Sequence, residues 1–570
     1  MATRRGRWVR VVVVVGILAW LGVAAVLLLK AKTANEDARD ALDRAQQRRK
    51  FHALIAPETG AQLAEAHKKL AEGHSLLSNP LLAPLKILPV VGRQVRAADR
   101  LDREAAEATD IARDALGELR DLSAAPAPGG AERLAVVKRL ADVVERSERR
   151  LRALDLGTDK ALIGPVQDAR DEFGDKLDDA VTNLDRAGTL LAGMQPFLDG
   201  SNYLLLGANN AEMRAGSGMF LSATTLTTDK GAIELGDVRP TNQLILPKGV
   251  PTRGDLPRNW PWLDTGADLR NLALTPQFPV SAEIAARIWA AEPGGQPVDG
   301  VMAIDVQGLQ AVLDVVGPVT VNGIQYSDRT IRAQLLNGQY AQFDSQGERT
   351  DQLGEVARQA FDRLEGGSWE VGDLATALIR IVSGRHLMVW SSDKVQQAGW
   401  EAASADGHIE EDSLAVSILN RGGNKLDYFF DVAADMTTQR DASGTDVKVV
   451  VHLTNRVPTN QPRYVQGPNT PSVIAGEYVT IAVANVPGTA SDLRFTGGAY
   501  ETLAGRDGPT QARGQYLRLK RGKKGTLTLS FHLPPEVRSV VLEPSARVPG
   551  TEWTFNGRTL GAEERRTLRW

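Results

Sequence analysis

The sequence predicts a multidomain α+β protein, and three observations lead to that fold class. An uncharged apolar stretch lies near the N-terminus, helical periodicity continues to about residue 200, and strand-like text follows it. At 570 residues the chain is long enough for several domains. The expected parts are a basic tail, a transmembrane helix, an antiparallel helical bundle, a central α/β domain and a C-terminal β-sandwich, at residues 1–10, 11–29, 31–200, 201–412 and 413–570.

The predicted membrane anchor is the stretch 11–29, "VVVVVGILAWLGVAAVLLL". It carries no charge and would be about 28 Å long as a helix, which matches the hydrocarbon core of a bilayer. Four arginines precede it, and acids follow soon after it, so the positive-inside rule predicts a cytoplasmic N-terminus and an extracytoplasmic remainder. The alternative is a cleaved signal peptide, which would have a shorter apolar core and a small-residue cleavage site.

Composition and motifs exclude several classes of function. The net charge of −3 argues against a general nucleic-acid binder. The chain has no cysteine, which excludes disulfides, thiolate metal sites and cysteine nucleophiles. Its seven histidines are scattered, and neither an HExxH nor a GxSxG motif is present. We therefore expect no cofactor and no metal.

Residues 31–200 contain five Ala-, Glu- and Lys-rich amphipathic segments separated by breaks rich in Pro or Gly. This pattern is typical of an elongated antiparallel bundle that serves as a stalk or platform. One break, "LLAPLKILPVV" at 81–91, is apolar where a surface loop should be polar. Either this segment dips into the bilayer interface, or it is a connector packed in the core.

From residue 201, strand-like runs alternate with helical stretches, which predicts an α/β domain whose helices cover a buried sheet. The strand-like runs include "YLLLG", "GMFLSATTLTT", "VDGVMAID" and "RTIRAQLLNGQYAQF", while 351–390 reads as helical. Asp305 is expected to cap the helix that follows "VDGVMAID". Beyond about residue 414, strands separated by regularly spaced turns predict the sandwich.

The stretch "YLLLGANNAEMRAGSGMF", residues 203–220, is the most distinctive motif. Its apolar run is expected to end at Gly207 and to open into a polar, glycine-loosened loop. Asparagine amides, the Arg214 guanidinium and two closely spaced glycines together could bind an anion. The alternative is structural: Asn209 and Asn210 would cap a helix, and Arg214 would pair with Glu212 or Asp305.

Three motifs in order, "LLLGANNAEMRAGSGMF", "DGVMAIDVQGLQAVLDVVGPV" and "NRGGNKLDYFF", resemble a bacterial membrane-protein family of unknown function. The family is known as domain of unknown function four thousand and twelve, and the resemblance covers roughly residues 201–470. It implies no activity. From its residues alone, "NRGGNKLDYF" indicates a turn between strands, with Lys425 and Asp427 paired.

A second resemblance is to the LytR–CpsA–Psr phosphotransferases, through Leu205-Leu206-Gly207 and the later arginines. That resemblance implies transfer of a glycopolymer from a polyprenyl-pyrophosphate carrier to the cell wall, with Mg²⁺ held by carboxylates. This chain departs from the pattern, because Asn209 replaces an acid, Arg214 is followed by Ala and Gly, and Arg239 by Pro. Arginines remain while carboxylates are thinned, which favours anion binding over metal-assisted catalysis.

These observations give one expected function and two alternatives. We expect a non-catalytic, membrane-anchored envelope protein that binds a polyprenyl-phosphate-linked glycan or another anionic ligand during surface-polymer assembly. Its expected partners are the cytoplasmic membrane and that ligand. The alternatives are a structural or protein-interaction module and an active phosphotransferase. The candidate ligand-binding residues are Asn209, Asn210, Arg214, Arg239, Asp305 and Arg349.

Overall fold

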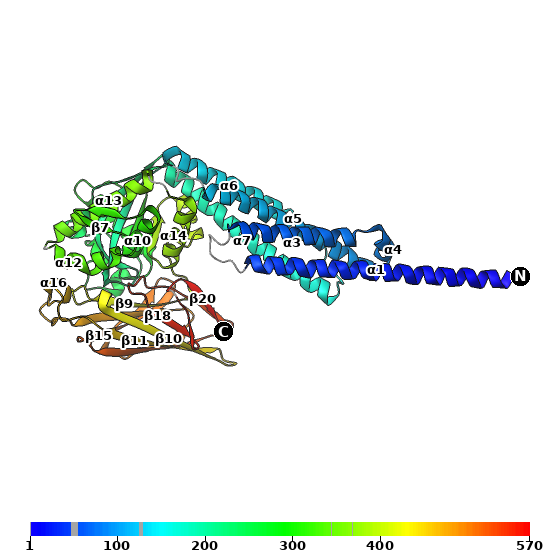
Figure 1. The fold of residues 1–570 in the computed structure, drawn as a ribbon. Coiled ribbons are helices and arrows are strands. Elements are labelled where there is room, and N and C mark those ends of the chain that lie inside the picture. The colour runs from blue at the N-terminus through cyan, green and yellow to red at the C-terminus, as the bar shows by residue number, and fades with distance from the viewer. Residues whose placement is uncertain (1, 47–54, 125–128, 344, 367–368, 562) are drawn as a thin grey trace. The chain divides into compact units, whose positions relative to one another are not determined.

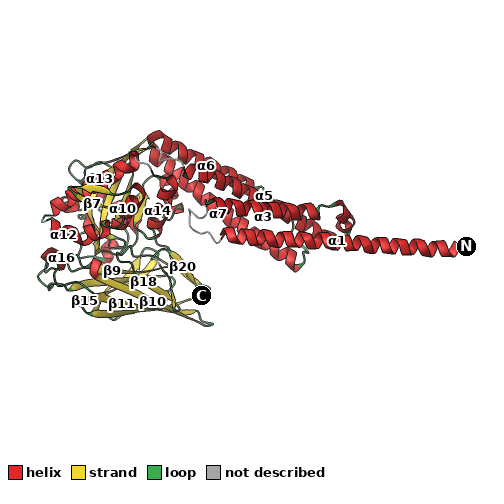
Figure 2. Ribbon diagram, viewed as in Figure 1, coloured by secondary structure: helices red, strands yellow, loops and turns green. Residues whose placement is uncertain are grey.

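The computed structural model describes residues 2–46, 55–124, 129–343, 345–366, 369–561 and 563–570, without the side chains of 2–18, 45, 46, 346 and 351. It confirms the multidomain α+β class, with helices and several sheets. The chain divides into two compact units. One comprises residues 1–125 and 136–191, and the other 126–135 and 192–570. Figure 2 colours the first almost entirely as helix and the second as a mixture of helices and strands.

The first unit is built from long helices that lie side by side (Figure 1). Pairs of ion pairs give the helix directions. Arg44–Glu65 and Lys69–Asp37 join helix 2–46 to helix 57–77, and Arg146–Glu118 and Arg150–Glu107 join helix 91–123 to helix 130–152. In both cases the residue numbers rise along one helix as they fall along the other. The predicted antiparallel packing of these helices is therefore confirmed. The elements are α1 (Ala2–Gln46), α3 (Pro57–Leu77), η1 (Pro80–Leu82), α4 (Ala83–Ile87), α5 (Val91–Ser123), α6 (Gly130–Arg152) and α7 (Gly164–Asp199), the last two reaching into the second unit.

Helix α1 runs without a break through the apolar stretch 11–29. Within the described part of the chain, we find no helix whose length and hydropathy would let it cross a membrane. Residues 11–18 of the stretch are described by their backbone only. The anchor therefore stays a prediction.

The central sheet of the second unit has the strand order β3-β2-β1-β5-β8, with β4 also paired to β2. Strand β1 runs parallel to β5 and antiparallel to β2. The strands are β1 (Gly200–Met213), β2 (Gly218–Asp229), β3 (Ala232–Leu235), β4 (Arg239–Pro240), β5 (Gly300–Asp305) and β8 (Leu387–Ser391). β8 lies in a stretch that the sequence predicted to be helical, so that expectation was wrong.

Helices pack on both faces of this sheet. Leu204 and Leu206 of β1 pack with α9 (Phe278–Ala291), whereas the alternate residues of β1 face α10 (Val306–Val316) and α13 (Gln346–Gly366). The segment 331–342, expected to be strand-like, is helical. Its buried residues Ile331, Leu335, Leu336 and Tyr340 recur at helical spacing, so one face of the helix packs in the core. The strand-like interpretation overlooked this spacing. The remaining elements here are η2 (Thr241–Gln243), α8 (Leu256–Asn259), η3 (Leu269–Asn271), β6 (Val319–Val321), β7 (Ile324–Tyr326), α11 (Ile331–Ala333), η4 (Gln334–Gly338), α12 (Gln339–Gln342), α14 (Val371–Ser383) and α15 (Lys394–Ala402).

Two six-stranded sheets form the C-terminal sandwich, in the orders β13-β16-β11-β10-β18-β19 and β14-β15-β12-β9-β17-β20. Their facing side chains share one core, to which alternate residues of each strand contribute. The elements are β9 (Ser413–Asn420), η5 (Asp427–Phe429), β10 (Phe430–Arg440), β11 (Thr445–Asn455), α16 (Arg463–Gln466), β12 (Tyr478–Val486), β13 (Ser491–Thr496), β14 (Tyr500–Asp507), β15 (Thr510–Leu519), β16 (Lys524–Leu533), β17 (Ser539–Leu542), β18 (Glu552–Phe555), β19 (Arg558–Thr559) and β20 (Arg566–Arg569).

Strands β9 and β12 are buried on both faces, because every residue in them is buried. One face, with Val416 and Ala482, joins the core of the sandwich. The other face, with Leu419 and Val483, packs into the core that also contains α9. The α/β part and the sandwich therefore share hydrophobic surface along these two strands.

Candidate functional site

Strand β1 continues well beyond Gly207, so the prediction of a loop from that position was wrong. The residues Asn209 to Met213 remain in the strand, with irregular pairing to β2. The chain turns only at residues 214–217, where the Arg214 N–H donates to the Ser217 carbonyl at 2.8 Å. The polar residues of the motif are therefore held by strand geometry.

The two glycines of this turn allow the chain to approach itself. A Cβ at Gly216 would lie 2.6 Å from the Thr275 carbonyl oxygen. A Cβ at Gly218 would lie 2.4 Å from the Asn209 carbonyl carbon. Both neighbours are backbone, so no side-chain rotation could relieve the overlap. The structure thus gives these glycines a packing role.

Asp305 and Asn210 together cap helix α10. The Asp305 carboxylate accepts the Gly308 N–H at 3.0 Å, as predicted from the sequence, and the Asn210 amide at 2.7 Å. The Asn210 Oδ1 accepts the Val306 N–H at 3.2 Å, and His386 Nδ1 lies 2.6 Å from Asp305 Oδ2. Asn210 is fully buried and Asp305 is 3% exposed. This arrangement matches the structural alternative for Asn210.

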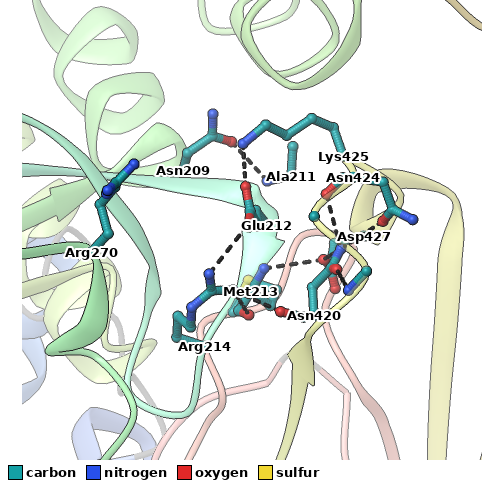
Figure 3. Close-up of polar contacts among 12 residues, drawn as sticks. Asn209, Ala211, Glu212, Met213, Arg214, Arg270, Asn420, Asn424, Lys425 and Asp427 are labelled. Atoms are coloured by element: carbon teal, nitrogen blue, oxygen red, sulfur yellow. Dashed lines mark hydrogen bonds and ion pairs between the residues drawn. The ribbon is translucent and has the colours of Figure 1, made fainter. Parts of the chain in front are cut away.

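Glu212 is the acid at the centre of a buried ion cluster (Figure 3). Its carboxylate accepts Arg214 Nη2 at 3.2 Å, and Lys425 forms an ion pair with the other oxygen. Burial alone would raise the pKa of Glu212, but the Lys425 ammonium and the Arg214 guanidinium lower it to about 2. Glu212 is therefore ionised at neutral pH.

Arg214 is 3% exposed, and its guanidinium is largely used inside the protein. Besides Glu212, it donates to the carbonyls of Met213 and Asn420, at 3.0 and 2.9 Å. Among the described atoms its buried Nε finds no hydrogen-bond acceptor. The ion pair with Glu212 is the one that the structural alternative predicted. Through the Asn420 carbonyl, Arg214 also holds the end of β1 to the end of β9.

Lys425 and Asp427 do not pair with each other, so that prediction was wrong. Asp427 instead lies 2.9 Å from Arg547, and it also accepts Met213 N–H and Tyr478 Oη. These partners come from β1, β12 and the segment after β17, at separations of 214, 51 and 120 residues, so the local sequence around Asp427 could not indicate them. Asp427 is therefore the acid that joins three parts of the second unit.

Two further arginines face the Glu212 cluster, and the sequence reasoning selected neither. Arg270, held by Asp268 at 2.7 Å, interacts electrostatically with Glu212. Arg421 is half-buried, and burial followed by the neighbouring Arg214 lowers its pKa to about 10. Within the described residues, the Arg421 guanidinium makes no hydrogen bond or ion pair. An unpaired guanidinium beside a second one favours an anionic ligand.

We call the open space beside Lys425 the basic pocket. It encloses about 460 Å³ and contains Arg463, which is exposed and has no ion-pair partner among the described side chains. Arg349 lies behind it, 4.5 Å above the Tyr464 ring. The lining residues are Glu212, Gly423, Lys425, Arg463, Tyr464, Pro468 and Asn469.

An apolar cavity of about 110 Å³ lies on the face of the central sheet covered by α10 and α13. Asn209 lines it and donates to Tyr340 Oη at 2.9 Å. Tyr340 in turn packs against Tyr464 of the basic pocket, with 5.6 Å between ring centroids. The remaining lining residues are mostly apolar, among them Leu205, Leu221, Leu235, Val238, Ile304, Leu309, Leu335, Leu353, Ala357 and Phe361.

Of the six candidate residues, the structure brings Asn209, Arg214, Asp305 and Arg349 to this region, and Asn210 is bonded to Asp305. Arg239 lies elsewhere: its guanidinium is 5.8 Å from the centre of the Trp289 ring, in α9. Val238, which precedes β4, lines the cavity, whereas Arg239 lies against α9 on the opposite face of the sheet. Within the residues described, we find no cluster of three or more His, Asp or Glu side chains that could hold a metal.

Sequence reasoning missed Arg421, Arg463, Tyr340 and Tyr464. Arg421 and Lys425 both occur in "NRGGNK", so the dense basic character of that turn was an available signal. Nothing in the sequence placed the tyrosines beside it.

Comparison with known families gives one match. Residues 199–340 match the model of a family described as a protein of unknown function, DUF4012. No curated protein and no solved structure is significantly similar to the chain. The matched segment includes β1, the turn at Arg214, Asp305 and Tyr340, and therefore one side of the apolar cavity and the Glu212 cluster.

Proposed function

We propose that the protein is a membrane-anchored, extracytoplasmic envelope protein that binds a polyprenyl-phosphate-linked glycan without catalysing its transfer. The apolar cavity would take the first part of the lipid chain, and the basic pocket would take the phosphate. The observation that carries the proposal is the adjacency of these two spaces through Asn209, Tyr340 and Tyr464.

Charge supports an anion in the basic pocket. Lys425 and Arg463 line the pocket with Glu212, and Arg214 and Arg421 interact electrostatically with Glu212 from outside the lining, so cations outnumber the carboxylate in and around the pocket. Arg463 extends this positive charge to the pocket surface. Phosphate oxygens are strong acceptors for such donors, and a guanidinium can bind two of them at once.

The anchor and the topology rest on the sequence. The stretch 11–29 is uncharged, and four arginines precede it. On α1 the side chains of Leu21, Val23, Val26 and Leu29 are exposed, which a lipid environment would accommodate.

Binding of farnesyl phosphate to the full chain in detergent tests the proposal, with farnesol and inorganic phosphate as half-ligands. Arg463→Gln should weaken binding of farnesyl phosphate about tenfold or more, because it removes a charge-assisted contact. Ala357→Phe should weaken it by filling the cavity. Arg494→Gln, which removes an exposed arginine of β13, is the matched control and should leave the affinity unchanged.

The outcomes separate the three functions considered above. Binding that depends on both Arg463 and Ala357, without turnover, supports the proposal. No binding would favour a structural or interaction module. A farnesyl-pyrophosphate-linked sugar tests the third function: transfer of the sugar phosphate to an acceptor glycan, with release of farnesyl phosphate, would instead indicate a phosphotransferase.

Topology has its own test. Reporter fusions at residue 60 and at the C-terminus should both report an extracytoplasmic position. A C-terminus that resists protease in intact cells with a permeable wall would contradict it.

A further inference from the structure

The segment between α3 and α5 presents apolar side chains to the outside of the helical unit. Leu81, Ile87, Leu88, Val90 and Val91, which we call the apolar wedge, are 50%, 82%, 47%, 67% and 42% exposed. Single exposed apolar residues are common on protein surfaces, but a contiguous set of this kind marks an interaction surface.

The wedge is fixed against α1. Leu82 and Leu85 point inward and pack with Ala24, and Trp20, Leu27 and Leu28 complete that contact. The Trp20 indole donates to the Leu81 carbonyl at 2.7 Å. These α1 residues all lie within the uncharged stretch 11–29, so the wedge is held beside the outer half of the predicted span.

The backbone of this segment is suited to an apolar environment. Pro80, Pro84 and Pro89 carry no N–H group. The N–H of Leu81 donates to Asn79 Oδ1 at 2.9 Å, and that of Leu88 donates to the Leu85 carbonyl at 3.1 Å. Irregular backbone is tolerated at membrane depth only where such groups find partners.

Charges near the wedge are either neutralised or placed at its border. Lys86 Nζ lies 2.9 Å from Asp99 Oδ2. Arg93 and Arg96 follow the wedge on α5 and are exposed, while Lys30 and Lys32 follow the apolar stretch on α1. Basic residues at the end of an apolar surface match the position of anionic lipid headgroups.

We propose that the apolar wedge inserts into the membrane leaflet that faces the helical bundle, as a second lipid contact beside α1. A bilayer is favoured over a protein partner because the wedge continues the exposed apolar surface of α1 at Leu21 and Val26. The inference rests on the membrane anchor of the proposed function.

Because the chain has no cysteine, single cysteines can report the surroundings of each position. Ile87→Cys and Val90→Cys probe the wedge, Leu21→Cys probes the anchor, and Lys138→Cys probes an exposed position on α6 as the control. Each full-chain variant is labelled with an environment-sensitive fluorophore and placed in phosphatidylethanolamine–phosphatidylglycerol vesicles. Lipid-attached nitroxides and aqueous iodide then serve as quenchers.

The expected result is loss of fluorescence to the lipid-attached quencher at Leu21, Ile87 and Val90, and to iodide only at Lys138. Lipid quenching at Leu21 alone, with iodide quenching at both wedge positions, would overturn the inference while leaving the anchor intact. Shielding of the wedge from both quenchers would show a protein cover and also overturn it. Failure at Leu21 as well would refute the anchor itself.

Discussion

The guanidinium of Arg547 lies 2.9 Å from the carboxylate of Asp427, and neither side chain has any exposed surface. Replacing Arg547 by Met would leave a buried carboxylate without its cation, so we expect a loss of about 3–5 kcal/mol in the free energy of unfolding. Urea denaturation measures this. The exposed pair Arg456–Asp431 provides the control, since Arg456→Met should cost about 0–1 kcal/mol. Equal losses in the two variants would contradict full burial of the first pair.

Arg214→Lys and Arg214→Ala should both lower the melting temperature of the second unit. A lysine cannot donate to Glu212 and to the Asn420 carbonyl with the geometry of a guanidinium, and alanine removes both contacts. Calorimetry and farnesyl phosphate affinity are measured on the same preparations. If affinity falls while the melting temperature holds, Arg214 is chiefly a ligand contact, as the sequence suggested, and the structural role is wrong.

The ion cluster should make the second unit sensitive to acid. The pKa of Glu212 is lowered from 4.5 to about 2, so its ionised form stabilises the folded state above pH 4.5. This stabilisation is lost as the pH falls from about 4.5 to 2. Glu212→Gln should be much less stable than the wild type at pH 7, and the gap should narrow in that acidic range. A gap that stays constant with pH would refute the assignment.

Asp102 should have the opposite effect on the helical unit. Burial raises its pKa from 3.8 to about 7, and the nearby Asp99 adds to the rise against the hydrogen bond from Asn35. The folded state therefore holds a proton that the unfolded state has released, and stability falls as the pH rises from about 4 to 7. Asp102→Asn should melt at a higher temperature than the wild type at pH 8 and at a similar temperature at pH 4. A variant curve parallel to the wild type would show that Asp102 does not titrate there.

Two glycine substitutions should act in opposite directions. In Gly218→Ala the new methyl group would lie 2.5 Å from the Asn209 carbonyl oxygen, so we expect a loss of about 1–3 kcal/mol. Gly117 lies in helix α5, and a Cβ added there would meet no atom within 4 Å. Because alanine has the higher helix propensity, Gly117→Ala should stabilise the helix by about 0.5–1 kcal/mol. Thermal melts of both variants test the pair, and destabilisation by Gly117→Ala would show an unrecognised contact.

The helical unit was predictable because its signals are local. Ala-, Glu- and Lys-rich periodicity and Pro or Gly breaks act within a few residues, so the antiparallel helices followed directly. The sandwich was also predicted, from turns at regular spacing. The end of β1 was not predicted. Asn210, Glu212 and Arg214 are polar residues, which favour a surface loop, but tertiary partners bury them within the strand.

Those partners are remote in the chain, which also limited the prediction of the site. Lys425 meets Glu212 across a separation of 213 residues, and Arg547 meets Asp427 across 120. Residue chemistry indicated that Arg214 would be held by an anion, and the structure supplies a carboxylate of the protein itself. Among the described residues, the cations without such a partner are Arg421, which lies within the motif "NRGGNK", and Arg463, which lies in a separate segment after β11.

The double burial of β9 and β12 has a consequence for the segment that the family model matches. Excised residues 199–340 would lack β8 at one edge of their sheet and the hydrophobic cover from Leu419 and Val483. The N–H of Met213 would lose Asp427, and Arg214 would lose the Asn420 carbonyl. We therefore expect this segment not to fold on its own. We expect residues 192–570 to melt as one cooperative block, so that an insertion or deletion within the sandwich is felt at the turn after β1.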